Sequence, residues 1–577
     1  MNAERLLQHY EQIADAPDAI ARLRRFILDL AVRGKLVPQD FEEEPASELL
    51  KRIAEEKARL LKAGEIRTPK PLSAVVDVTF SIPSNWSWSQ IAEIGIMTPR
   101  NDAPDALVAS FVPMPLIAAE YGVANRHEVR TWGQIKKGYT HFAEGDVGLA
   151  KITPCFENGK STVFRNLTGG IGSGTTELHV VRPLLVVADY ILLFWKSPHF
   201  IETGIPKMTG TAGQKRVPTD YFANSSFPLP PLAEQRRIVA KVDELMALCD
   251  ELEAARTERE TKRDRLAAAS LARLNNPNPE TLADDARFAL DALPALTARP
   301  DQIKQLRQTI LNLAVRGKLV PQDPTDEPAE ELLKRIAGKK TEKARKSEGR
   351  RNGLPDASLR REEELAPDNW TWTQLGAVAL SMRYGTSVKC DYGTKGAPVL
   401  RIPNVSGGRV SLDDIKFGSL SPSEMEDLSL REGDILLIRS NGSLEIVGRA
   451  AVVTPDAAGM SFAGYLVRLR TDPTEIDPAY IWLALQSSEV RDQIEQPIRS
   501  AVGLKNVNLT EFGALTFRLP PLAEQHRIVA KVDELMALCD HLGTSLTSVD
   551  ETRKKLLDTL LAEALSLTTT EYRVAAE

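Results

Sequence analysis

Three short segments of this 577-residue chain contain residue types that could bind a nucleotide or a cofactor. ENGKST at 157–162 has the Gly-Lys-Ser order of a phosphate-binding loop, but Pro154 stands where that loop needs its first glycine. GGIGSG at 169–174 fits a flexible surface loop better than a nucleotide-binding loop. DPAY at 477–480 faintly matches an adenine-methyltransferase motif, but its aspartate and proline suit the start of the apolar helix that comes next. We therefore expect none of the three to be a catalytic or cofactor site.

The rest of the sequence offers no better candidate for catalysis. The seven histidines and four cysteines are scattered, without a C-x-x-C pair or a cluster with metal-ligand spacing. No G-x-G-x-x-G segment follows a predicted strand, and no carboxylate–lysine set is typical of a nuclease. We therefore predict a chain that has no catalytic residue and binds no cofactor or metal of its own.

The elements that could position a functional surface begin with a segment that occurs twice. LPPLAEQRRIVAKVDELMALCD at 229–250 returns at 519–540 and differs only at Arg236 versus His526, which indicates a duplicated unit. Its prolines stop the preceding element, and its apolar residues then recur at the spacing of an a/d helix seam. We expect this seam to pair with another helix or with a partner subunit. The seam residues are Ile238, Val242, Leu245, Cys249 and Leu252 in the first copy and Ile528, Val532, Leu535, Cys539 and Leu542 in the second.

A second repeated segment, AVRGKLVPQD, occurs at 31–40 and 314–323, and each copy predicts two helices joined at a turn. We expect 275–300 to connect the first seam helix to the second hairpin, and 339–361 to be a charged linker. The predicted segments are an N-terminal helical hairpin (1–71), a first domain (72–228), a central helical region with the first seam helix, the second hairpin and the linker (229–361), a second domain (362–518) and a C-terminal helix (519–577).

The order of these segments predicts how the chain closes. Because the first seam helix continues into the second hairpin, the second seam helix can form the same pairing only with the N-terminal hairpin. We therefore expect a pseudo-two-fold circular arrangement. The predicted fold class is mixed α/β, with two α/β domains separated by long antiparallel coiled-coil helices.

The first and second domains have matching ends and different centres. Both begin with Trp-x-Trp-x-Gln, at 86–90 and 370–374. Both carry Gly-Asp before a β-branched run, and both end with a Gly-x-Lys pair before the repeated prolines. This pattern indicates one scaffold that presents two different surfaces.

The bulk composition limits the function classes that remain. Hydrophobic content of 42% and charged content of 26% are ordinary for a globular protein. The formal net charge of −6 is not that of a general nucleic-acid binder, so any such contact must come from local basic surfaces. The N-terminus is not a secretory signal, and the most apolar stretch, 183–195, is too short to span a bilayer. We expect a cytoplasmic protein with reduced thiols and no membrane contact.

The pattern PLPPLAEQRRIVAKVDELM at 228–246 resembles the conserved helical region of the specificity subunits of type I restriction-modification enzymes. In that family, one chain carries two target-recognition domains separated by two such regions, and the resemblance covers nearly the whole chain. It implies a non-catalytic subunit that recognises a bipartite DNA target for DNA methylation and phage defence. Its partners would be double-stranded DNA, modification subunits that use S-adenosylmethionine, and a restriction subunit that uses ATP and magnesium.

Under this hypothesis, DNA contacts should come from basic, amide and hydroxyl side chains in loops of both domains. Arg and Lys suit phosphates and guanine edges, and Asn can pair with adenine. The candidates are Lys151, Thr153, Lys160, Ser161, Lys215 and Arg216 in the first domain, and Tyr384, Ser387, Lys389, Arg401, Asn404, Arg439, Ser440, Asn441, Lys505 and Asn506 in the second.

Two other interpretations stay open. The chain could be the recognition half of a self-contained methyltransferase-nuclease, although too few residues precede the first domain for a catalytic domain. It could also be a coiled-coil scaffold that does not bind DNA. Salt-dependent, sequence-specific DNA binding by the assembled complex would exclude the scaffold.

Overall fold

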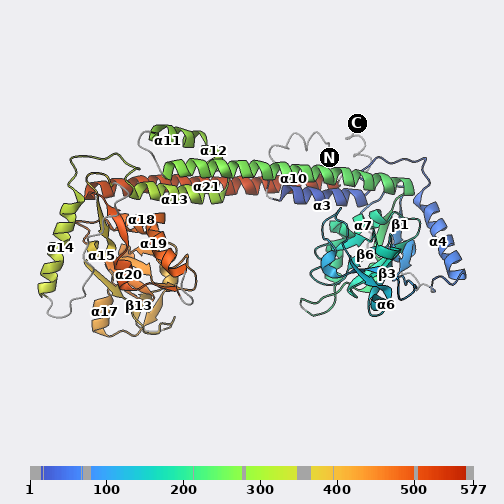
Figure 1. Ribbon diagram of the computed structural model, residues 1–577, viewed down its shortest axis with the longest axis horizontal. Coiled ribbons are helices and arrows are strands. Elements are labelled where there is room, and N and C mark those ends of the chain that lie inside the picture. Colours follow the sequence, from blue (N-terminus) through green and yellow to red (C-terminus); the bar gives the residue numbers. More distant parts are fainter. Residues whose placement is uncertain are drawn as a thin grey trace. The chain divides into compact units, whose positions relative to one another are not determined.

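The computed structural model describes residues 15–566, except 17, 67, 69–79, 212, 276–280, 347–365, 394–395 and 500–504. The chain divides into two compact units, Met1–Arg259 with Val549–Glu577, and Glu260–Ser548. Each unit contains one α/β domain and part of each of two long helices, α10 (Leu232–Asn275) and α21 (Leu522–Ser566), as Figure 1 shows. The predicted fold class, with two α/β domains and long helices, is confirmed.

The repeated AVRGKLVPQD segment joins α3 (Ala19–Val32) to α4 (Ala46–Lys62), and α13 (Pro300–Val315) to α14 (Ala329–Lys346). Its glycine has a positive φ in both copies, 68° at Gly34 and 67° at Gly317, and a Cβ there would collide with a proline ring. This explains why the turn is the same in both copies. In Figure 1, α4 runs away from α3 rather than back beside it, so the pair is not a hairpin.

Two segments that we expected to connect larger elements contain helical residues. Residues 275–300 contain α11 (Leu282–Asp291) and α12 (Leu293–Leu296), because apolar side chains there cover the end of α10. The expected linker at 339–361 begins inside α14, and its residues 347–361 lie outside the described part of the chain. The first 14 residues of the predicted N-terminal hairpin also lie outside it.

The first domain is built around a four-stranded antiparallel sheet and a second sheet in which β3 and β8 are parallel. The first sheet has the order β2 (Gly95–Met97), β9 (Leu178–Pro183), β6 (Val147–Ala150), β7 (Ser161–Val163). The second has the order β4 (Glu128–Thr131), β3 (Val108–Val112), β8 (Ile171–Gly174), β5 (Thr140–Ala143). Its helices are α5 (Ile91–Ile94), α6 (Trp132–Ile135), α7 (Ala188–Lys196), α8 (Pro198–Gly204) and α9 (Thr219–Asn224).

The second domain repeats the first sheet in the same order: β12 (Ser381–Tyr384), β19 (Leu466–Arg470), β15 (Ile435–Ile438), β17 (Ala450–Val452). In the described residues, its second sheet has three strands, β14 (Lys416–Gly418), β13 (Ala397–Leu400) and β18 (Ser461–Phe462). Its helices are α15 (Leu375–Val378), α16 (Ile402–Val405), α17 (Pro422–Leu428), α18 (Pro478–Gln486), α19 (Ser488–Arg499) and α20 (Leu509–Gly513). The two domains therefore share one sheet and differ in the other.

A two-stranded sheet closes each domain next to its long helix. β1 (Ser87–Gln90) pairs with β10 (Ser226–Leu229), and β11 (Thr371–Gln374) pairs with β21 (Thr516–Leu519). The strands come from the Trp-x-Trp-x-Gln segments and from the residues just before the repeated prolines. The matching ends of the two domains are thus the parts that attach them to the long helices.

The glutamine of each repeated LAEQ segment ties the long helix to its domain. The Gln235 side chain accepts a hydrogen bond from Val187 N and donates one to Pro230 O, both at 2.9 Å. In the second copy, Gln525 makes the two equivalent bonds at the same length. Both glutamines are buried, so the repeated sequence preserves a structural joint.

The neighbouring glutamate connects the same joint to the repeated turn. Glu524 accepts hydrogen bonds from Gln322 at 2.6 Å and from Trp370 Nε1 at 2.8 Å, and Glu234 accepts one from Gln39 at 2.7 Å. Burial raises the pKa of both carboxyl groups above their ordinary value. The glutamate and glutamine of each LAEQ segment thus connect the long helix to its domain and to the AVRGKLVPQD turn.

The seam of the long helices packs inside each unit against shorter helices and the domain, so it pairs with other helices and does not face a partner subunit. Ile238, Val242, Met246 and Cys249 are buried in one cluster with α3, α4 and the first domain. Ile528, Val532 and Cys539 are buried with α13 and the second domain. Leu245, Leu535 and Leu542 only flank these clusters, and Met246 occupies the buried position that we assigned to Leu245.

Leu252, the last predicted seam residue of the first copy, is 39% exposed and is not a core residue. Beyond Cys249, the contact between α10 and α3 becomes ionic, because Arg24 bonds Asp250 and Glu253 at 2.7 Å each. The regular apolar spacing therefore continues past the point where the packing ends.

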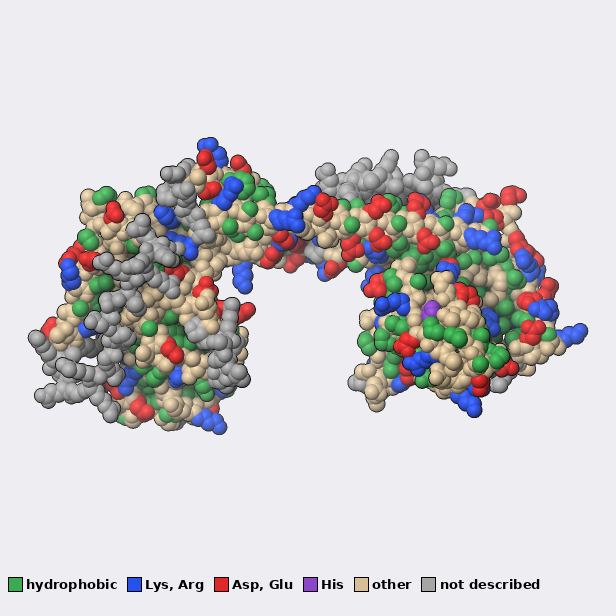
Figure 2. All heavy atoms as spheres, viewed as in Figure 1, with side chains coloured by type: hydrophobic (Ala, Val, Ile, Leu, Met, Phe, Trp, Pro, Cys, Tyr) green, Lys and Arg blue, Asp and Glu red, His purple; other side chains and the backbone are tan. Residues whose placement is uncertain are grey.

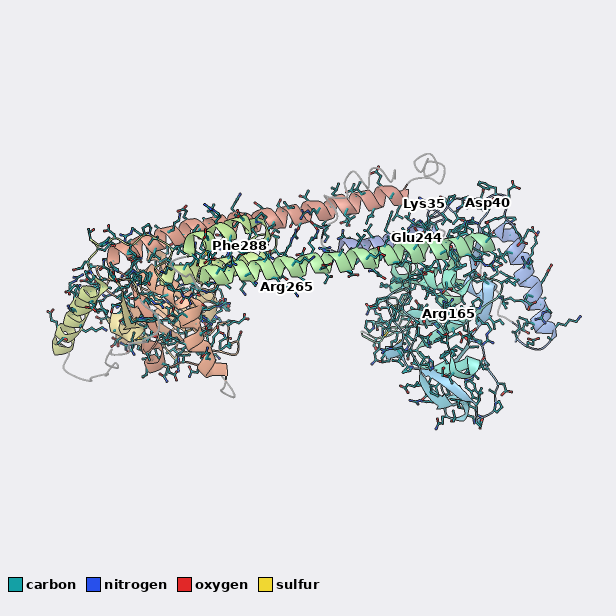
Figure 3. The ribbon with its side chains drawn as sticks, turned by 45° about the horizontal axis from the view of Figure 1, so that its top comes forward. Lys35, Asp40, Arg165, Glu244, Arg265 and Phe288 are labelled. Atoms are coloured by element: carbon teal, nitrogen blue, oxygen red, sulfur yellow. The ribbon has the colours of Figure 1, made fainter. Side chains whose placement is uncertain are left out.

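The C-terminal part of α21 contacts the N-terminal α3, as the order of the repeated segments predicts. Leu557 and Leu560 pack with Ala16 and Ala19. Lys35 lies at the C-terminal end of α21 (Figure 3), where its ammonium donates to Leu565 O at 2.6 Å. The end of α10 contacts α12 and α13 in the same way within the other unit, through an apolar cluster and a bond from the Asn275 side chain to Thr309.

Candidate nucleic-acid interface

In the first domain, three separate segments meet just beyond the end of β6. Lys151 N donates to Glu177 O at 3.0 Å, and Lys151 O accepts from Val217 N at 2.7 Å. Thr153 N donates to Lys215 O at 2.9 Å, which fixes the third segment beside the first. We call residues 151–153, 177 and 215–216 the first strand-end surface.

The second domain builds the same arrangement beyond the end of β15. Arg439 N donates to Tyr465 O at 2.9 Å, and Arg439 O accepts from Val507 N at 2.8 Å. The short strands β16 (Ser440–Asn441) and β20 (Lys505–Asn506) then pair, with Ser440 opposite Asn506. We call residues 439–441, 465 and 505–506 the second strand-end surface.

The structure thus brings together nine of the sequence-predicted candidates. They are Lys151, Thr153, Lys215 and Arg216 on the first strand-end surface, and Arg439, Ser440, Asn441, Lys505 and Asn506 on the second. The side chain of Lys505 lies outside the described part of the structure. The strand that follows each Gly-Asp segment and the lysine of each Gly-x-Lys pair therefore lie next to each other in both domains.

On the first strand-end surface, an arginine and a glutamate form a two-point pair. Arg216 Nε and Nη2 each donate to one carboxylate oxygen of Glu177 at 2.9 Å, and Nη1 donates to Gln214 O at 3.1 Å. Arg216 holds the pKa of Glu177 below its ordinary value, and Lys151 adds a smaller effect in the same direction. The guanidinium is therefore fixed in place on an exposed loop.

On the second strand-end surface, an arginine packs on an aromatic ring. The Arg439 guanidinium lies over the Tyr384 ring at 4.3 Å, and the Tyr384 hydroxyl accepts from Leu509 N at 3.0 Å. Tyr465 is 62% exposed. The exposed candidates Ser387 and Lys389 come next in the same loop, which Thr386 N joins to Phe462 O at 2.9 Å.

Two predicted contact residues are buried, which corrects those assignments. The Ser161 hydroxyl, in strand β7, donates to Gly159 O at 3.1 Å. The Asn404 side chain accepts from Arg401 N at 2.8 Å and so closes the first turn of α16. Both side chains satisfy local backbone groups and cannot reach a macromolecule.

Two further candidates lie outside the strand-end surfaces and are half-buried. Lys160 Nζ donates to Met114 O at 3.4 Å, and Arg401 pairs with Asp414 at 2.7 Å. These local bonds account for both residues, and their role in binding stays a prediction.

The glycine-lysine segment at 157–162 has the wrong groups facing inward for a phosphate-binding loop. Lys196 Nζ, buried in α7, donates to Gly159 O at 3.1 Å and to Ala119 O at 2.8 Å. A phosphate loop needs backbone N–H groups directed at the ligand, whereas here carbonyl oxygens face a cation. Burial lowers the pKa of Lys196 to about 7.

Most of the segment at 169–174 is a strand, not the flexible loop that we expected, and only Gly169 and Gly170 are exposed. Residues 171–174 form β8, which pairs with both β3 and β5. A Cβ at Gly172 would collide with the Phe142 ring and with Ser110 O, so the glycines allow close packing. At 477–480, the Asp477 side chain accepts from Ala479 N at 2.8 Å and caps α18, as predicted.

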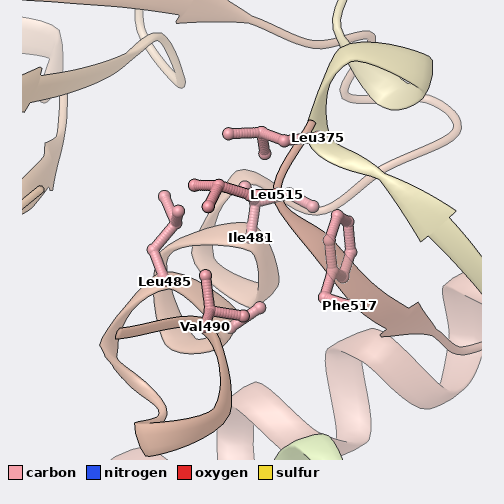
Figure 4. A pocket seen from close by; sticks show the side chains of 7 residues that line it. Leu375, Ile481, Leu485, Val490, Leu515 and Phe517 are labelled. Atoms are coloured by element: carbon pink, nitrogen blue, oxygen red, sulfur yellow. The ribbon is translucent and has the colours of Figure 1, made fainter. Parts of the chain in front are cut away.

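The remaining features of the described chain do not suggest a small-molecule site. Figure 4 shows a small cavity in the second domain that is lined by apolar side chains: Leu375, Ile481, Ala484, Leu485, Val490, Leu515 and Phe517. No group of three or more His, Cys, Asp or Glu side chains in the described residues could hold a metal ion. Of the described helices, none is both long enough and apolar enough to cross a membrane.

Acidic and basic side chains are interspersed along the visible face of the long helices (Figure 2). The helices therefore do not present a uniform basic stripe on this face. Local positive charge comes instead from loop residues such as those of the strand-end surfaces.

Sequence reasoning missed Glu177 and Tyr465, which complete the two strand-end surfaces. Each residue directly precedes the strand β9 or β19, and neither belongs to a repeated motif. The signal that could have found them is their equivalent position before matching strands. The joint residues Glu234 and Gln235 were also missed, although their identity in both copies was visible.

The chain is similar in sequence to known proteins over nearly its whole length. No family model matches the chain. It is 38% identical over 556 residues to the type I restriction enzyme EcoAI specificity subunit of Escherichia coli, covering 95% of this chain and 94% of that protein. It is 38% identical over 562 residues to the EcoEI specificity subunit of Escherichia coli, with the same coverage. Among solved structures, the HsdS subunit from Thermoanaerobacter tengcongensis is 19% identical, with a TM-score of 0.44 over 85% of this chain and 98% of that one.

The chain belongs to the family of type I restriction enzyme specificity subunits. It is a DNA-recognition subunit of a restriction-modification system and is not itself the enzyme. The resemblance carried by the repeated PPLAEQ helix is thereby confirmed.

Proposed function

We propose that each strand-end surface contacts one half of a bipartite DNA target. The observation that carries this proposal is that the two domains build the same backbone arrangement and place different side chains on it. A shared backbone fixes how each domain approaches the duplex, and different side chains allow different bases to be chosen. In this proposal the chain binds no cofactor and acts in the cytoplasm. Its modification subunits use S-adenosylmethionine, and its restriction subunit uses ATP and magnesium.

The first strand-end surface supplies the groups that DNA binding needs. Lys215 and Arg216 are exposed, and Lys151 and Thr153 are half-buried beside them. Lysine ammonium groups contact phosphates, which gives affinity and makes it depend on salt. Arginine and asparagine can also contact base edges in the major groove.

Reversing one charge tests whether this surface faces DNA. In the assembled complex, Lys215→Glu is expected to weaken binding to all sequences and to lower the salt slope of binding by about one. The matched control is Lys137→Glu, the same charge reversal at another exposed lysine of the first domain, which should bind as wild type. The measurement is the DNA affinity of each complex over a range of salt concentrations. A Lys215→Glu complex with the affinity and salt slope of wild type would contradict the proposal.

Because the seam is buried within each unit, we propose that partner subunits dock on another face of the long helices. Leu248 is 47% exposed, and its counterpart Leu538 in the second copy is 55% exposed. A single exposed leucine is ordinary on a protein surface, but here it recurs at the same place in both copies and belongs to neither hydrophobic core, which favours a shared partner. We assign this face to the modification subunits, with one docking position in each copy.

A pair of substitutions on one helix separates folding from docking. Val242→Asp places an unpaired carboxylate in the core and is expected to cost several kcal/mol, so that the first unit unfolds. Leu248→Asp should change the free energy of unfolding by less than about 0.5 kcal/mol and yet reduce binding of a modification subunit. Thermal unfolding and co-purification measure the two effects. Normal co-purification of the double variant Leu248→Asp and Leu538→Asp would rule out this docking face.

A further inference from the structure

Each strand-end surface has two neighbouring positions that are equivalent between the domains but carry different side chains. Glu177 and Tyr465 occupy equivalent positions. The backbone carbonyl of each accepts a hydrogen bond from the residue that directly follows β6 or β15, which is Lys151 or Arg439. Arg216 and Asn506 also occupy equivalent positions, because Arg216 pairs with Ile152 and Asn506 pairs with Ser440, one residue further along the chain than Lys151 and Arg439. The first pair is therefore Glu177 with Arg216, and the second is Tyr465 with Asn506.

The Glu177–Arg216 pair matches the edge of a G·C base pair. Arg216 uses three of its five N–H donors in the bonds to Glu177 and Gln214, so within the described residues two donors stay available for the acceptors of guanine. The Glu177 carboxylate has further lone pairs, which can accept from the amino group of cytosine.

The same glutamate argues against a phosphate contact for Arg216. A phosphate brought to this guanidinium would also approach the Glu177 carboxylate, and like charges repel. A base edge carries no net charge, so it avoids this repulsion. The ion pair also holds the guanidinium fork in one orientation before DNA arrives.

The second pair has the complementary chemistry for an A·T base pair. Asn506 is exposed, and an asparagine side chain can both accept from and donate to adenine. Its neighbour Tyr465 has no carboxylate to accept from cytosine, and its exposed ring can pack on the methyl group of thymine.

We propose that these two pairs are base-reading positions, with Glu177 and Arg216 selecting a G·C pair in one half-site and Tyr465 and Asn506 selecting an A·T pair in the other. This inference rests on the proposed function, in that the strand-end surfaces face DNA. It adds which residues choose a base and which base each one chooses.

An exchange of the two pairs tests the assignment. The full chain, assembled with its modification subunits, is bound to a pool of duplexes in which the target is varied one base pair at a time. Glu177→Tyr with Arg216→Asn should change the preference at one base pair of one half-site from G·C to A·T, by roughly ten- to a hundred-fold. Tyr465→Glu with Asn506→Arg should make the opposite change in the other half-site. Each variant should leave the other half-site unchanged.

Two outcomes would overturn the inference. If the first exchange weakens binding equally to all sequences and lowers the salt slope, Arg216 contacts phosphate, while the strand-end surface still faces DNA. If preference and affinity are both unchanged, Arg216 does not contact DNA. The proposed function itself fails only if Lys215→Glu binds DNA as wild type, so the two failures are distinguishable.

A single substitution keeps the test available if an exchanged pair does not fold. Glu177→Gln retains the size of the side chain and removes the charge that fixes Arg216. It should reduce the discrimination between G·C and A·T several-fold at the same base pair and leave all other positions unchanged. Unchanged discrimination in this variant would also overturn the inference.

Discussion

Exchange of residues 91–225 for the matching segment of a related specificity subunit is expected to replace one half of the recognised DNA sequence. The exchanged segment lies between β1 and β10, the two strands that attach the first domain to α10. It carries the whole first strand-end surface, while the joint residue Gln235 stays in place. Because each wrong base pair costs about 1–3 kcal/mol, a half-site of several base pairs should change its preference by orders of magnitude.

A shorter exchange sharpens this prediction. Replacing only 90–213 leaves Arg216 in place while Glu177 is exchanged, so the preference at the base pair that Arg216 reads should be retained in full only if the related subunit also has a carboxylate at position 177, and should otherwise be weakened. Genome-wide methylation mapping of cells that express each chimera reports both half-sites at once. The matched control is the exchange of 375–515 in the second domain, which should change only the other half-site. A chimera in which both half-sites change together would show that the domains do not read DNA independently.

Duplication made much of the fold predictable from one sequence. Two copies of the PPLAEQ helix and of the AVRGKLVPQD turn fix the order of the elements, and both segments are the same because they form joints. Gln235 and Gln525 make identical bonds, and Gly34 and Gly317 adopt the same φ within one degree. Repeated local sequence therefore indicated repeated local structure.

Burial within the helices was less predictable, because spacing identifies an apolar stripe and not the element that covers it. Met246 is buried where we placed Leu245, and Leu252 continues the spacing beyond the end of the packing. Ser161 and Asn404 have side chains that suit DNA, and yet backbone groups beside them take up their hydrogen bonds. These outcomes depend on neighbours that are distant in sequence.

The candidate interface was predictable only in part for the same reason. The segments near Lys151 and Lys215 could be matched between the domains by their GD and Gly-x-Lys patterns. Their meeting with residue 177 depends on how β9 pairs with β6, which sets Glu177 O against Lys151 N. Strand pairing over such distances in the sequence carries no local signal.

The distance between the two half-sites is expected to follow the length of the long helices. The chain passes between its two units only at Arg259–Glu260 in α10 and at Ser548–Val549 in α21. Inserting four helix-forming residues at both points should lengthen the path between the domains and keep the contacts inside each unit. Those contacts include the Arg299–Glu260 pair at 3.0 Å and the packing of Leu557 against α3.

Four added residues lengthen a helix by about 6 Å and rotate the helical segment beyond the insertion by roughly 40° in excess of a full turn. A DNA base pair adds about 3.4 Å and a twist of roughly 35°. The rotation matches one added base pair, and the rise matches nearly two if the helices lie parallel to the DNA. We therefore expect the doubly inserted variant to recognise the same two half-sites with a spacer longer by one or two base pairs.

The single insertion in α10 is the matched control for this double variant. It lengthens α10 by four residues without lengthening α21, so the end of α21 must give up its packing on Ala16 and Ala19 or α10 must bend. We expect the single variant to be less stable and less active than the double variant, with no well-defined longer spacer. Methylation mapping of both variants measures the spacer, and thermal unfolding measures the strain. An active double variant with the original spacer would show that the long helices do not set the distance between the half-sites.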